Sequence, residues 1–572
     1  MLRDEKADFQ GILIGSYTFL ILNQGNRKAL ICLMILRNSW LVSLLLLLSL
    51  GVGAQPASRS YLDVLHYDFH VKVTDQNDSL EAKAGITVQY VSDTHTIAFD
   101  LKNVNDTGKG MQVSAVSENG RQLKFSHLHD QIRIDLPDLA VARSIHTYQI
   151  EYGGIPADGL IISRNQFHRR TLFSDNWPNR ASHWIPCIDH PSDKATVDFW
   201  VIAPEHYKAV ANGDLIQEKI TGKQEKLTHW SEKMPLPTKV MVIGLADFAV
   251  DYPGTVDGIP VSSWIFPENK KAGFSDYAQA TTILPFFIRK IGPYNYSKLA
   301  NVQSRTIFGG MENAGTIFYY DKSVTGTGKN ELLMVHEIAH QWFGDAATET
   351  DWPHLWLSEG FATEMTHLYV LDKYGKAEMN KGLSKDREQV IAFTKKRKTP
   401  VVDTTAGNNI KALLNTNSYQ KGGWVLEMLR QKLGDSLFWK GIQVYYARFR
   451  NANASTPDLQ KVFEEVSDRK LDTFFHQWLY RPENPNLQIE WQYLAKEQTL
   501  ELTIQQKTKE PFQLQLDMLF TDSSGKETLR NIFLNEPVTR VRFPYQYKPI
   551  KVVADPDCHL LYEGNIIEKT TQ

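Results

Sequence analysis

Three residues within one pentapeptide have the types and spacing of a metal-dependent hydrolytic site. His336 and His340 are four positions apart, and Glu337 lies between them. On a helix, residues four apart share a face, so both imidazoles can reach one ion. Zinc suits imidazole ligands, and a catalytic zinc site commonly keeps three protein ligands and one open position for water. The carboxylate of Glu337 can then approach that water and take its proton.

A third ligand is predicted 19 positions beyond His340. Glu359 lies near the start of the next predicted helix, and the stretch containing Trp352 and Pro353 can turn the chain and bring the two helices side by side. Apolar residues flank the pentapeptide on both sides, which predicts a buried helix, where unpaired polar groups would cost about 1–3 kcal/mol each. A surface helix with ordinary charged residues fits these flanks poorly. We therefore predict one zinc ion per chain, held by His336, His340 and Glu359.

Two helices must position these ligands. Residues 331–343 have apolar positions at helical spacing and end before Gly344, a residue type that often terminates helices. The residue pattern at 358–374 predicts a second helix, which is expected to end at Gly375. Further helices are predicted at 424–433, 436–449 and 458–467.

Strand-like alternation dominates on both sides of this helical region. Apolar and polar residues alternate with period two, and turn residues separate the runs, as antiparallel sheets require. The runs are 67–73, 86–90, 132–136 and 196–202 on one side, and 487–491, 500–504, 512–516 and 538–543 on the other. The predicted fold is multi-domain α+β: an N-terminal antiparallel β domain at 55–255, a mainly helical zinc domain at 256–485, and a small C-terminal β-sandwich at 486–572.

The composition excludes several classes of protein. With 42% hydrophobic residues in 572, the chain can bury a core, which argues against disorder. A net charge of −2 gives no general attraction to nucleic acid, so none is expected as a partner. Three cysteines exclude a disulfide scaffold, and we expect Cys187 and Cys558 to be isolated buried thiols, although their pairing is left open.

The N-terminal region predicts export. A nearly unbroken apolar run at 40–50 follows Arg37 and precedes small residues ending at Ala54. A basic residue, an apolar core near ten residues and a small-residue site describe a secretory signal peptide. We expect residues 1–54 to be this region, with cleavage after Ala54.

Residues 1–33 fit a signal peptide poorly, which favours Met34 as the true start. The alternative is an uncleaved membrane anchor over residues 29–50, which is long enough if one charge is tolerated. We expect a periplasmic or extracellular protein with no stable membrane insertion after cleavage.

Several motifs around the zinc pattern occur in an order that closely resembles the aminopeptidase N family of zinc metallopeptidases, which includes leukotriene hydrolase. The motifs are His183-Trp-Ile-Pro-Cys-Ile-Asp-His-Pro-Ser-Asp-Lys-Ala195, Gly309-Gly-Met-Glu-Asn-Ala-Gly315, Tyr419-Gln-Lys-Gly422 and Phe474-Phe-His-Gln-Trp478. The resemblance implies a thermolysin-like zinc domain. It also implies an exported bacterial-type member without the long helical C-terminal domain of many larger members, and we expect a more open active site.

The same resemblance implies that Glu312 binds the free α-ammonium group of a peptide. An amino terminus has a pKa near 8, so at pH 7 it is mostly cationic and pairs with a carboxylate. Gly309 and Gly310 would leave backbone accessible to an extended peptide, and Met311 and Asn313 belong to the same substrate-binding segment. Such a group admits peptides with a free amino terminus and disfavours acylated ones.

Two further roles follow from the resemblance. Tyr419 would donate its hydroxyl to the oxyanion that develops on the scissile carbonyl, and Glu337 would act as general base. Many family members also place a Gln or Glu in the β domain to hold the substrate amine. Here a tryptophan, Trp177, stands where that side chain is expected, and Asp175 is the candidate replacement.

The leading hypothesis is an exported zinc aminopeptidase that hydrolyses the first peptide bond of peptides. The alternatives within hydrolases are a zinc endopeptidase and a leukotriene-hydrolase-like epoxide hydrolase. The non-enzymatic alternative is an inactive peptide-binding scaffold, which commonly loses a ligand or the general base. The sequence leaves the preferred first residue and the oligomeric state open.

Overall fold

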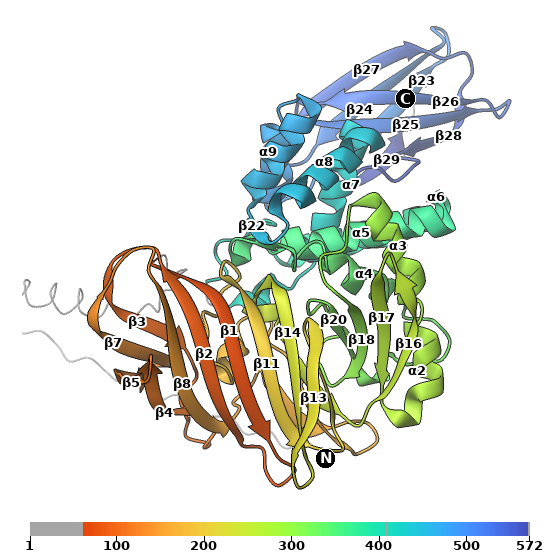
Figure 1. Cartoon of the computed structure of the whole chain (residues 1–572). Helices are drawn as coiled ribbons and strands as arrows, with labels where there is room; N and C mark the ends of the chain where they lie inside the picture. Colours follow the sequence, from red (N-terminus) through yellow and green to blue (C-terminus); the bar gives the residue numbers. More distant parts are fainter. Residues whose placement is uncertain (1–60, 408, 570–572) are drawn as a thin grey trace, which may run out of the picture. The chain divides into compact units, whose positions relative to one another are not determined.

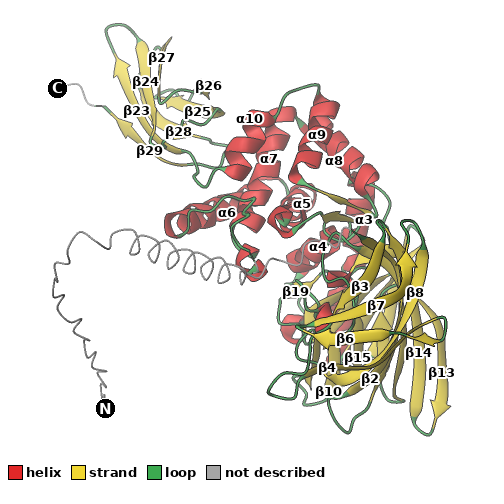
Figure 2. Cartoon of the chain, turned by 90° about the vertical axis from the view of Figure 1, so that its left-hand side faces the viewer, coloured by secondary structure: helices red, strands yellow, loops and turns green. Residues whose placement is uncertain are grey.

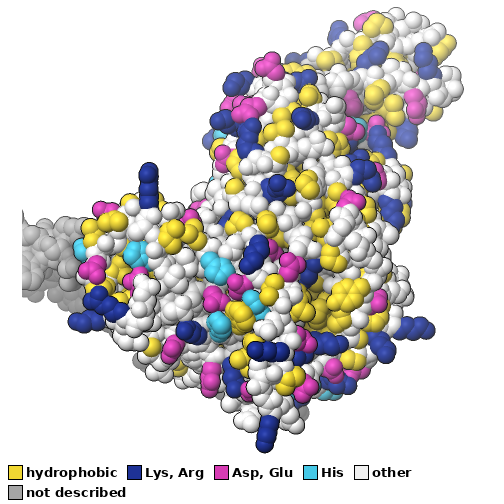
Figure 3. Space-filling view, viewed as in Figure 1, with side chains coloured by type: hydrophobic (Ala, Val, Ile, Leu, Met, Phe, Trp, Pro, Cys, Tyr) yellow, Lys and Arg dark blue, Asp and Glu magenta, His cyan; other side chains and the backbone are white. Residues whose placement is uncertain are grey.

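The computed structural model describes residues 61–407 and 409–569. The expected signal peptide, its cleavage site and the alternative start at Met34 lie outside these residues. Among the described residues, no helix combines the length and apolar character needed to cross a membrane. Positive and negative side chains are interspersed on the face shown in Figure 3, in keeping with the balanced net charge.

The N-terminal region is built from three sheets (Figure 1, red to yellow). The eight-stranded sheet has the order β13 (Asp214–Gly222), β14 (Glu225–Pro237), β11 (Lys194–Pro204), β1 (Leu62–Val73), β2 (Leu80–Tyr90), β8 (Ile145–Ile155), β4 (Gly110–Glu118), β5 (Arg121–Gln122). A four-stranded sheet has the order β12 (Lys208–Ala211), β15 (Ile243–Ala246), β10 (Arg170–Ser174), β9 (Leu160–Arg164), and a three-stranded sheet the order β3 (Thr94–Asp100), β7 (Gln131–Ala140), β6 (Lys124–Leu128).

The predicted alternation corresponds to strands in this region. In β11, Val197, Phe199 and Val201 are buried and the residues between them are partly exposed, as a strand with one face on the core requires. The pairs in the three sheets are antiparallel as predicted, except that β1 and β11 run parallel.

The next region is not only helical, because it begins with a five-stranded sheet. Its order is β16 (Ala249–Val256), β17 (Ile259–Ile265), β18 (Leu299–Ser304), β20 (Thr316–Tyr320), β19 (Gly310–Met311). β16 pairs with β17, so residues predicted at the end of the first domain join the sheet of the second. All six residues of β18 are buried, which removes the alternation that identifies a half-exposed strand.

Nine helices in the described part of this region follow or surround that sheet (red in Figure 2). They are α2 (Lys270–Tyr277), α3 (Ala280–Lys290), α4 (Glu331–His340), α5 (Trp356–Tyr374), α6 (Lys376–Lys396), α7 (Gly422–Leu433), α8 (Asp435–Phe449), α9 (Thr456–Ser467) and α10 (Asp472–Phe475), together with the short strands β21 (Ala347–Glu349) and β22 (Ala452–Ala454).

The predicted helices agree with α4, α5, α7, α8 and α9, with small shifts at their ends. α5 ends at Tyr374, and the next residue, Gly375, has a positive φ of 87° that suits glycine, as the sequence suggests. α4 ends at His340, three residues earlier than predicted, because the chain leaves the helix through a tight turn in which the Trp342 amide donates to the Ala339 carbonyl. α6 has no counterpart among the predicted helices.

The C-terminal region is a two-sheet β-sandwich, as predicted. One sheet has the order β27 (Val538–Pro544), β24 (Thr499–Gln506), β23 (Asn486–Leu494), β29 (Glu563–Glu568), and the other the order β26 (Glu527–Leu534), β25 (Leu514–Asp522), β28 (Pro549–Ala554). Phe520 of β25 and Phe543 of β27 pack across the two sheets with ring centroids 5.4 Å apart. Cys187 and Cys558 are both buried, in the first and third regions.

A buried ion pair joins the β region to the zinc region. Lys239 follows β14, and its Nζ lies 2.5 Å from Glu349 Oε1 in β21; both side chains are almost fully buried. Burial opposes the lysine charge, but Glu349 and Glu312 outweigh it and raise the pKa of Lys239. Such a pair is costly to break, because either partner alone leaves an uncompensated buried charge.

Replacing Lys239 by Met is therefore expected to lower the free energy of unfolding by about 3–5 kcal/mol, measured by urea titration. The double variant Lys239→Met with Glu349→Leu should recover much of that loss, since both charges are gone. As a matched control, Glu465→Gln removes an exposed partner of Arg448, 2.7 Å away, and should change the free energy of unfolding far less, because water screens an exposed pair. Equal losses for the buried and the exposed pair would contradict this account of Lys239.

Candidate active site

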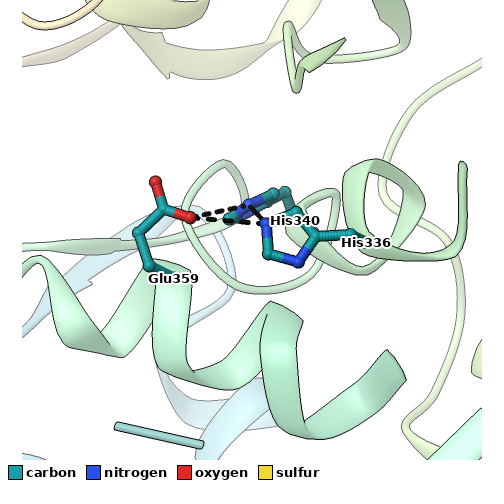
Figure 4. Close-up of side chains that lie close together, drawn as sticks. All are labelled: His336, His340 and Glu359. Atoms are coloured by element: carbon teal, nitrogen blue, oxygen red, sulfur yellow. Dashed lines mark hydrogen bonds and ion pairs between the residues drawn. The ribbon is translucent and has the colours of Figure 1, made fainter. Parts of the chain in front are cut away.

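α4 and α5 bring the three predicted ligands together (Figure 4). The Nε2 atoms of His336 and His340 lie 3.2 Å apart. Glu359 Oε2 lies 3.4 Å from His336 Nε2 and 3.3 Å from His340 Nε2. The two histidines come from adjacent turns of α4, and Glu359 lies in the first turn of α5. The three atoms thus form a nearly equilateral triangle.

The triangle fits a zinc ion. Ligands at about 2.0–2.1 Å in tetrahedral geometry are separated by about 3.3 Å, which matches the observed distances. Although burial disfavours the cation, Glu359 and the other nearby carboxylates raise the pKa of His340 to about 10. The negative charge of these carboxylates stabilises a cation at the ligand triangle. A divalent metal ion bound there would displace the proton from His340.

Contacts behind the ligands fix the orientation of His340. Its Nδ1 donates to the Phe343 carbonyl at 3.1 Å, and Ser358 Oγ lies 3.1 Å from the same nitrogen. Because a carbonyl oxygen only accepts, Nδ1 carries the hydrogen and Nε2 faces the other ligands. A Cβ at Gly344 would lie 2.3 Å from Ser358 Oγ, so this close arrangement requires glycine there.

Glu337 lies beside the metal centre and is not part of the ligand triangle. Its side chain is 5% exposed, and a Cβ at Gly310 would lie 2.2 Å from its Oε1. Gly310 therefore lets the backbone of β19 pass directly against this carboxylate. Burial raises the pKa of Glu337 to about 8, with His340 opposing and Glu312 adding to the shift.

A cavity of about 420 Å³ opens onto these groups. Most of the predicted site residues line it, together with further apolar and polar side chains. The lining residues among the predicted set are Gly309, Gly310, Met311, Glu312, His336, Glu337, His340, Glu359 and Tyr419. Asn313 and Asp175 are not among the lining residues.

The segment containing Glu312 forms one border of the cavity. β19 is an edge strand of its sheet, so its free side can pair with an extended peptide. Glu312 is 5% exposed, and within the described part of the chain its Oε1 has no hydrogen-bond partner. Burial raises the pKa of Glu312, and a substrate ammonium group would compensate its charge. The neighbouring Asn313 is fully buried and does not line the cavity.

Tyr419 faces the ligands from a π-helical turn, Asn417–Lys421, that leads into α7. Its ring stacks on that of His336 with centroids 6.1 Å apart and an interplanar angle of 15°. Burial raises the pKa of the Tyr419 phenol well above its usual range, so it remains a hydrogen-bond donor at neutral pH. Gly360 and Gly422 allow α5 and α7 to approach closely, since a Cβ at Gly360 would lie 2.9 Å from the Gly422 backbone.

Asp175, the candidate partner for a substrate amine, is fully engaged by the protein. It is completely buried; its Oδ1 accepts a hydrogen bond from Arg180, and its Oδ2 accepts from the Thr306 hydroxyl at 3.2 Å and the Ile307 amide at 3.3 Å. These contacts support the loop that leads to Gly309. Trp177 lines the cavity in its place, packed edge-to-face against Phe308 at 6.0 Å.

Sequence reasoning missed part of the cavity wall. Thr363, Thr366 and His367 on α5, and Asp386 on α6, also line the cavity. A signal for the first three was present, because they follow Glu359 at four, seven and eight positions and share its helix face. Asp386 carried no such signal, since its helix was not predicted.

Two family models match consecutive parts of the chain. The Peptidase M1 N-terminal domain matches residues 64–240, and the Peptidase family M1 domain matches residues 277–478. Together they cover more than half of the chain. This chain belongs to peptidase family M1, as the resemblance implied.

Similar proteins include the glutamyl aminopeptidase of Rattus norvegicus, 25% identical over 455 residues, and the aminopeptidase M1 of Arabidopsis thaliana, 26% identical over 422 residues. These alignments cover 73% and 67% of this chain, and 47% and 48% of the relatives. The chain thus spans about half the length of the curated relatives it matches. The M1 zinc metallopeptidase of Deinococcus radiodurans shares the fold, with a TM-score of 0.63 and 23% identity over 74% of this chain and 94% of that one.

Proposed function

We propose that this chain is a zinc-dependent aminopeptidase that hydrolyses the first peptide bond of peptides with a free amino terminus. The observation that carries the proposal is the convergence of three candidate metal ligands, a separate carboxylate beside them and, directly after the edge strand, the Glu312 carboxylate with one oxygen that lacks a hydrogen-bond partner among the described residues, all in one cavity. Membership of peptidase family M1 and relatives that are named aminopeptidases support it.

The roles of the residues follow from their positions. Glu312 pairs with the substrate ammonium group and places the first carbonyl near the metal centre, while β19 pairs with the extended backbone. A zinc ion held by His336, His340 and Glu359 would supply Lewis acidity and lower the pKa of water. Glu337 accepts a proton from the attacking water and returns it to the leaving amine.

The oxyanion that develops on the scissile carbonyl needs a donor. Tyr419 supplies one from the cavity wall, because its buried phenol remains protonated. The unpartnered Oε1 of Glu312 favours an exopeptidase over an endopeptidase, since the backbone at an internal peptide bond carries no ammonium group to pair with it. Retention of all ligands and of Glu337 argues against an inactive scaffold.

We also propose that the activity is exported to the periplasm or the extracellular space. This proposal rests on the basic, apolar and small-residue pattern at 34–54. N-terminal sequencing of the protein from the secreted or periplasmic fraction should find a chain that begins at Gln55.

Removal of the metal is expected to abolish hydrolysis of a leucyl coumarin amide. Treatment with a chelator followed by dialysis should lower the metal content from one zinc per chain to none, and stoichiometric zinc should restore both activity and thermal stability. Elemental analysis and thermal unfolding give readouts that do not depend on the substrate. Full activity in protein shown to be free of metal would contradict the proposal.

A further inference from the structure

Gln341, the residue after the ligand His340, has no role in the proposed chemistry, and yet its side chain is tied to the residues that have one. It is completely buried and is not among the residues that line the cavity. Its Nε2 donates to the Glu312 carbonyl oxygen at 2.7 Å and to Asp345 Oδ2 at 2.9 Å. The side-chain amide thus joins the end of α4 to the backbone of the amine-binding residue.

The oxygen of the same amide is bound as well. Gln341 Oε1 accepts from the Gly315 amide at 2.7 Å, and the Tyr294 hydroxyl lies 3.3 Å from the same oxygen. The Glu312 carbonyl can only accept a hydrogen bond, and the Gly315 amide can only donate one. The side chain of Gln341 therefore holds both backbone groups in one orientation only.

These two backbone groups lie at the two ends of the turn between β19 and β20. The turn is closed by the Thr316 amide, which donates to the Asn313 carbonyl at 2.9 Å. The Glu312 carbonyl precedes the turn, and the Gly315 amide lies near its end. Gln341 therefore fixes the whole turn, and with it the backbone from which the Glu312 side chain extends.

The same bonds connect this turn to the helix that carries the two histidines. Among the described residues, the Gln341 side chain makes the only hydrogen bonds between residues 309–316 and residues 331–345. β19 is only two residues long and pairs with β20 alone. The place of Glu312 relative to His340 thus depends on an amide one residue away from that ligand.

The distance between Glu312 and the metal centre matters because a substrate must be held at both places at once. In the proposed function the ammonium group binds Glu312 while the first carbonyl, two covalent bonds away, lies at the metal centre. A displacement of about 1 Å in such an arrangement can cost about a hundredfold in rate. No hydrogen bond from the described residues holds Glu312 Oε1, so the position of the carboxylate depends largely on where its backbone is fixed.

We propose that Gln341 is a positioning residue that fixes Glu312 at the distance from the metal centre which the ammonium group and the first carbonyl of a peptide require. This inference rests on the proposed aminopeptidase function and adds the residue that couples the amine-binding turn to α4. Asp345 supports this role, because its carboxylate binds the Gln341 amide and so holds the side chain in place.

The test measures by calorimetry the binding of leucine hydroxamic acid and of 4-methylpentanehydroxamic acid to the zinc-loaded full chain. Both compounds have the same metal-binding group and the same side chain, and only the first has an ammonium group. The wild type should bind the first about tenfold to a hundredfold more tightly. In Gln341→Asn the amide is one methylene shorter and cannot reach both ends of the turn, so this ratio should fall below about threefold. The Kd of the compound without the amine should stay within about twofold of the wild-type value, because its metal-binding group does not depend on Glu312.

The matched control is Gln506→Asn in the C-terminal sandwich. Gln506 is also buried, and its amide binds the backbone N–H and carbonyl of Phe512 at 2.8 and 3.0 Å, so the same shortening should leave the ratio unchanged. If Gln341→Asn does not fold, as judged by thermal unfolding, Gln341→Met takes its place. Methionine keeps the length of the side chain and removes its hydrogen bonds to the turn, so the ratio should fall in the same way with one zinc bound per chain.

Two results would overturn the inference and leave the proposed function standing. One is a folded, zinc-bearing Gln341 variant that keeps the wild-type ratio. The other is an equal weakening of both compounds, because Gln341 would then serve the stability of the site alone. A wild-type ratio near one would instead show that Glu312 does not bind the ammonium group, and would contradict the proposed function itself.

Discussion

Replacement of Glu337 by glutamine is expected to lower kcat about a thousandfold while one zinc per chain remains bound. The amide has nearly the same size as the carboxylate, so the contact with Gly310 can persist, but it cannot accept a proton from the attacking water. Because Glu337 is not one of the three converging ligands, metal affinity should change little. Steady-state rates with a leucyl coumarin amide and elemental analysis of the same sample measure both quantities.

The matched control for Glu337→Gln is Glu331→Gln, in the first turn of the same helix. Glu331 accepts hydrogen bonds from the Tyr369 and Tyr374 hydroxyls and pairs with Lys373, away from the ligand triangle. This variant should retain kcat within about twofold. If Glu337→Gln also retains activity within that range, Glu337 is not the general base and the proposed mechanism is wrong.

Replacement of Tyr419 by phenylalanine is expected to lower kcat by a factor of about 10²–10³ with little change in KM. The change removes one hydroxyl and leaves the ring that stacks on His336, so the loss should fall on the transition state, where one oxyanion donor is commonly worth about 2.7–4 kcal/mol. Tyr252→Phe removes a hydroxyl from a residue that is 68% exposed and should have no effect. A rise in KM at constant kcat would show instead that Tyr419 serves ground-state binding.

The ligand set could be predicted from sequence because its geometry is local. His336 and His340 are one helical turn apart, and α5 is the next α-helix along the chain after a connection of residues 341–355, so the sequence order already pairs the two helices that carry the ligands. Strands such as β7 and β11 could also be predicted, because buried and more exposed residues alternate along them and the alternation is visible in the sequence.

Other elements could not be predicted because their apolar residues form no periodic pattern. A strand buried on both faces is apolar throughout, and a helix with few buried residues has too few apolar positions. β18 is buried on both faces and therefore has no alternation. α6 shows the opposite problem: only Met379, Leu383 and Val390 are buried among its 21 residues. The stripe is too weak to predict a helix, and Asp386 was missed with it.

The groups that bind the carboxylate of Asp175 could not be predicted either, because they are brought to it only by the fold. The sequence shows a carboxylate near the position of an expected amine-binding side chain, but not that Arg180 and the backbone of Ile307 occupy its oxygens. Trp177 faces the cavity because its neighbours Phe308 and Trp352 pack edge-to-face against its ring. Contacts between segments more than a hundred residues apart decide which of the two residues meets a substrate.

The most direct test of the central claim is mass spectrometry of the products from one peptide in two forms, with a free and with an acetylated amino terminus. We predict that the metal-loaded enzyme removes residues one at a time from the free form, and that the acetylated form stays intact because it offers Glu312 no ammonium group. Cleavage of both forms at equal rates, or release of internal fragments, would show that the enzyme is not an aminopeptidase.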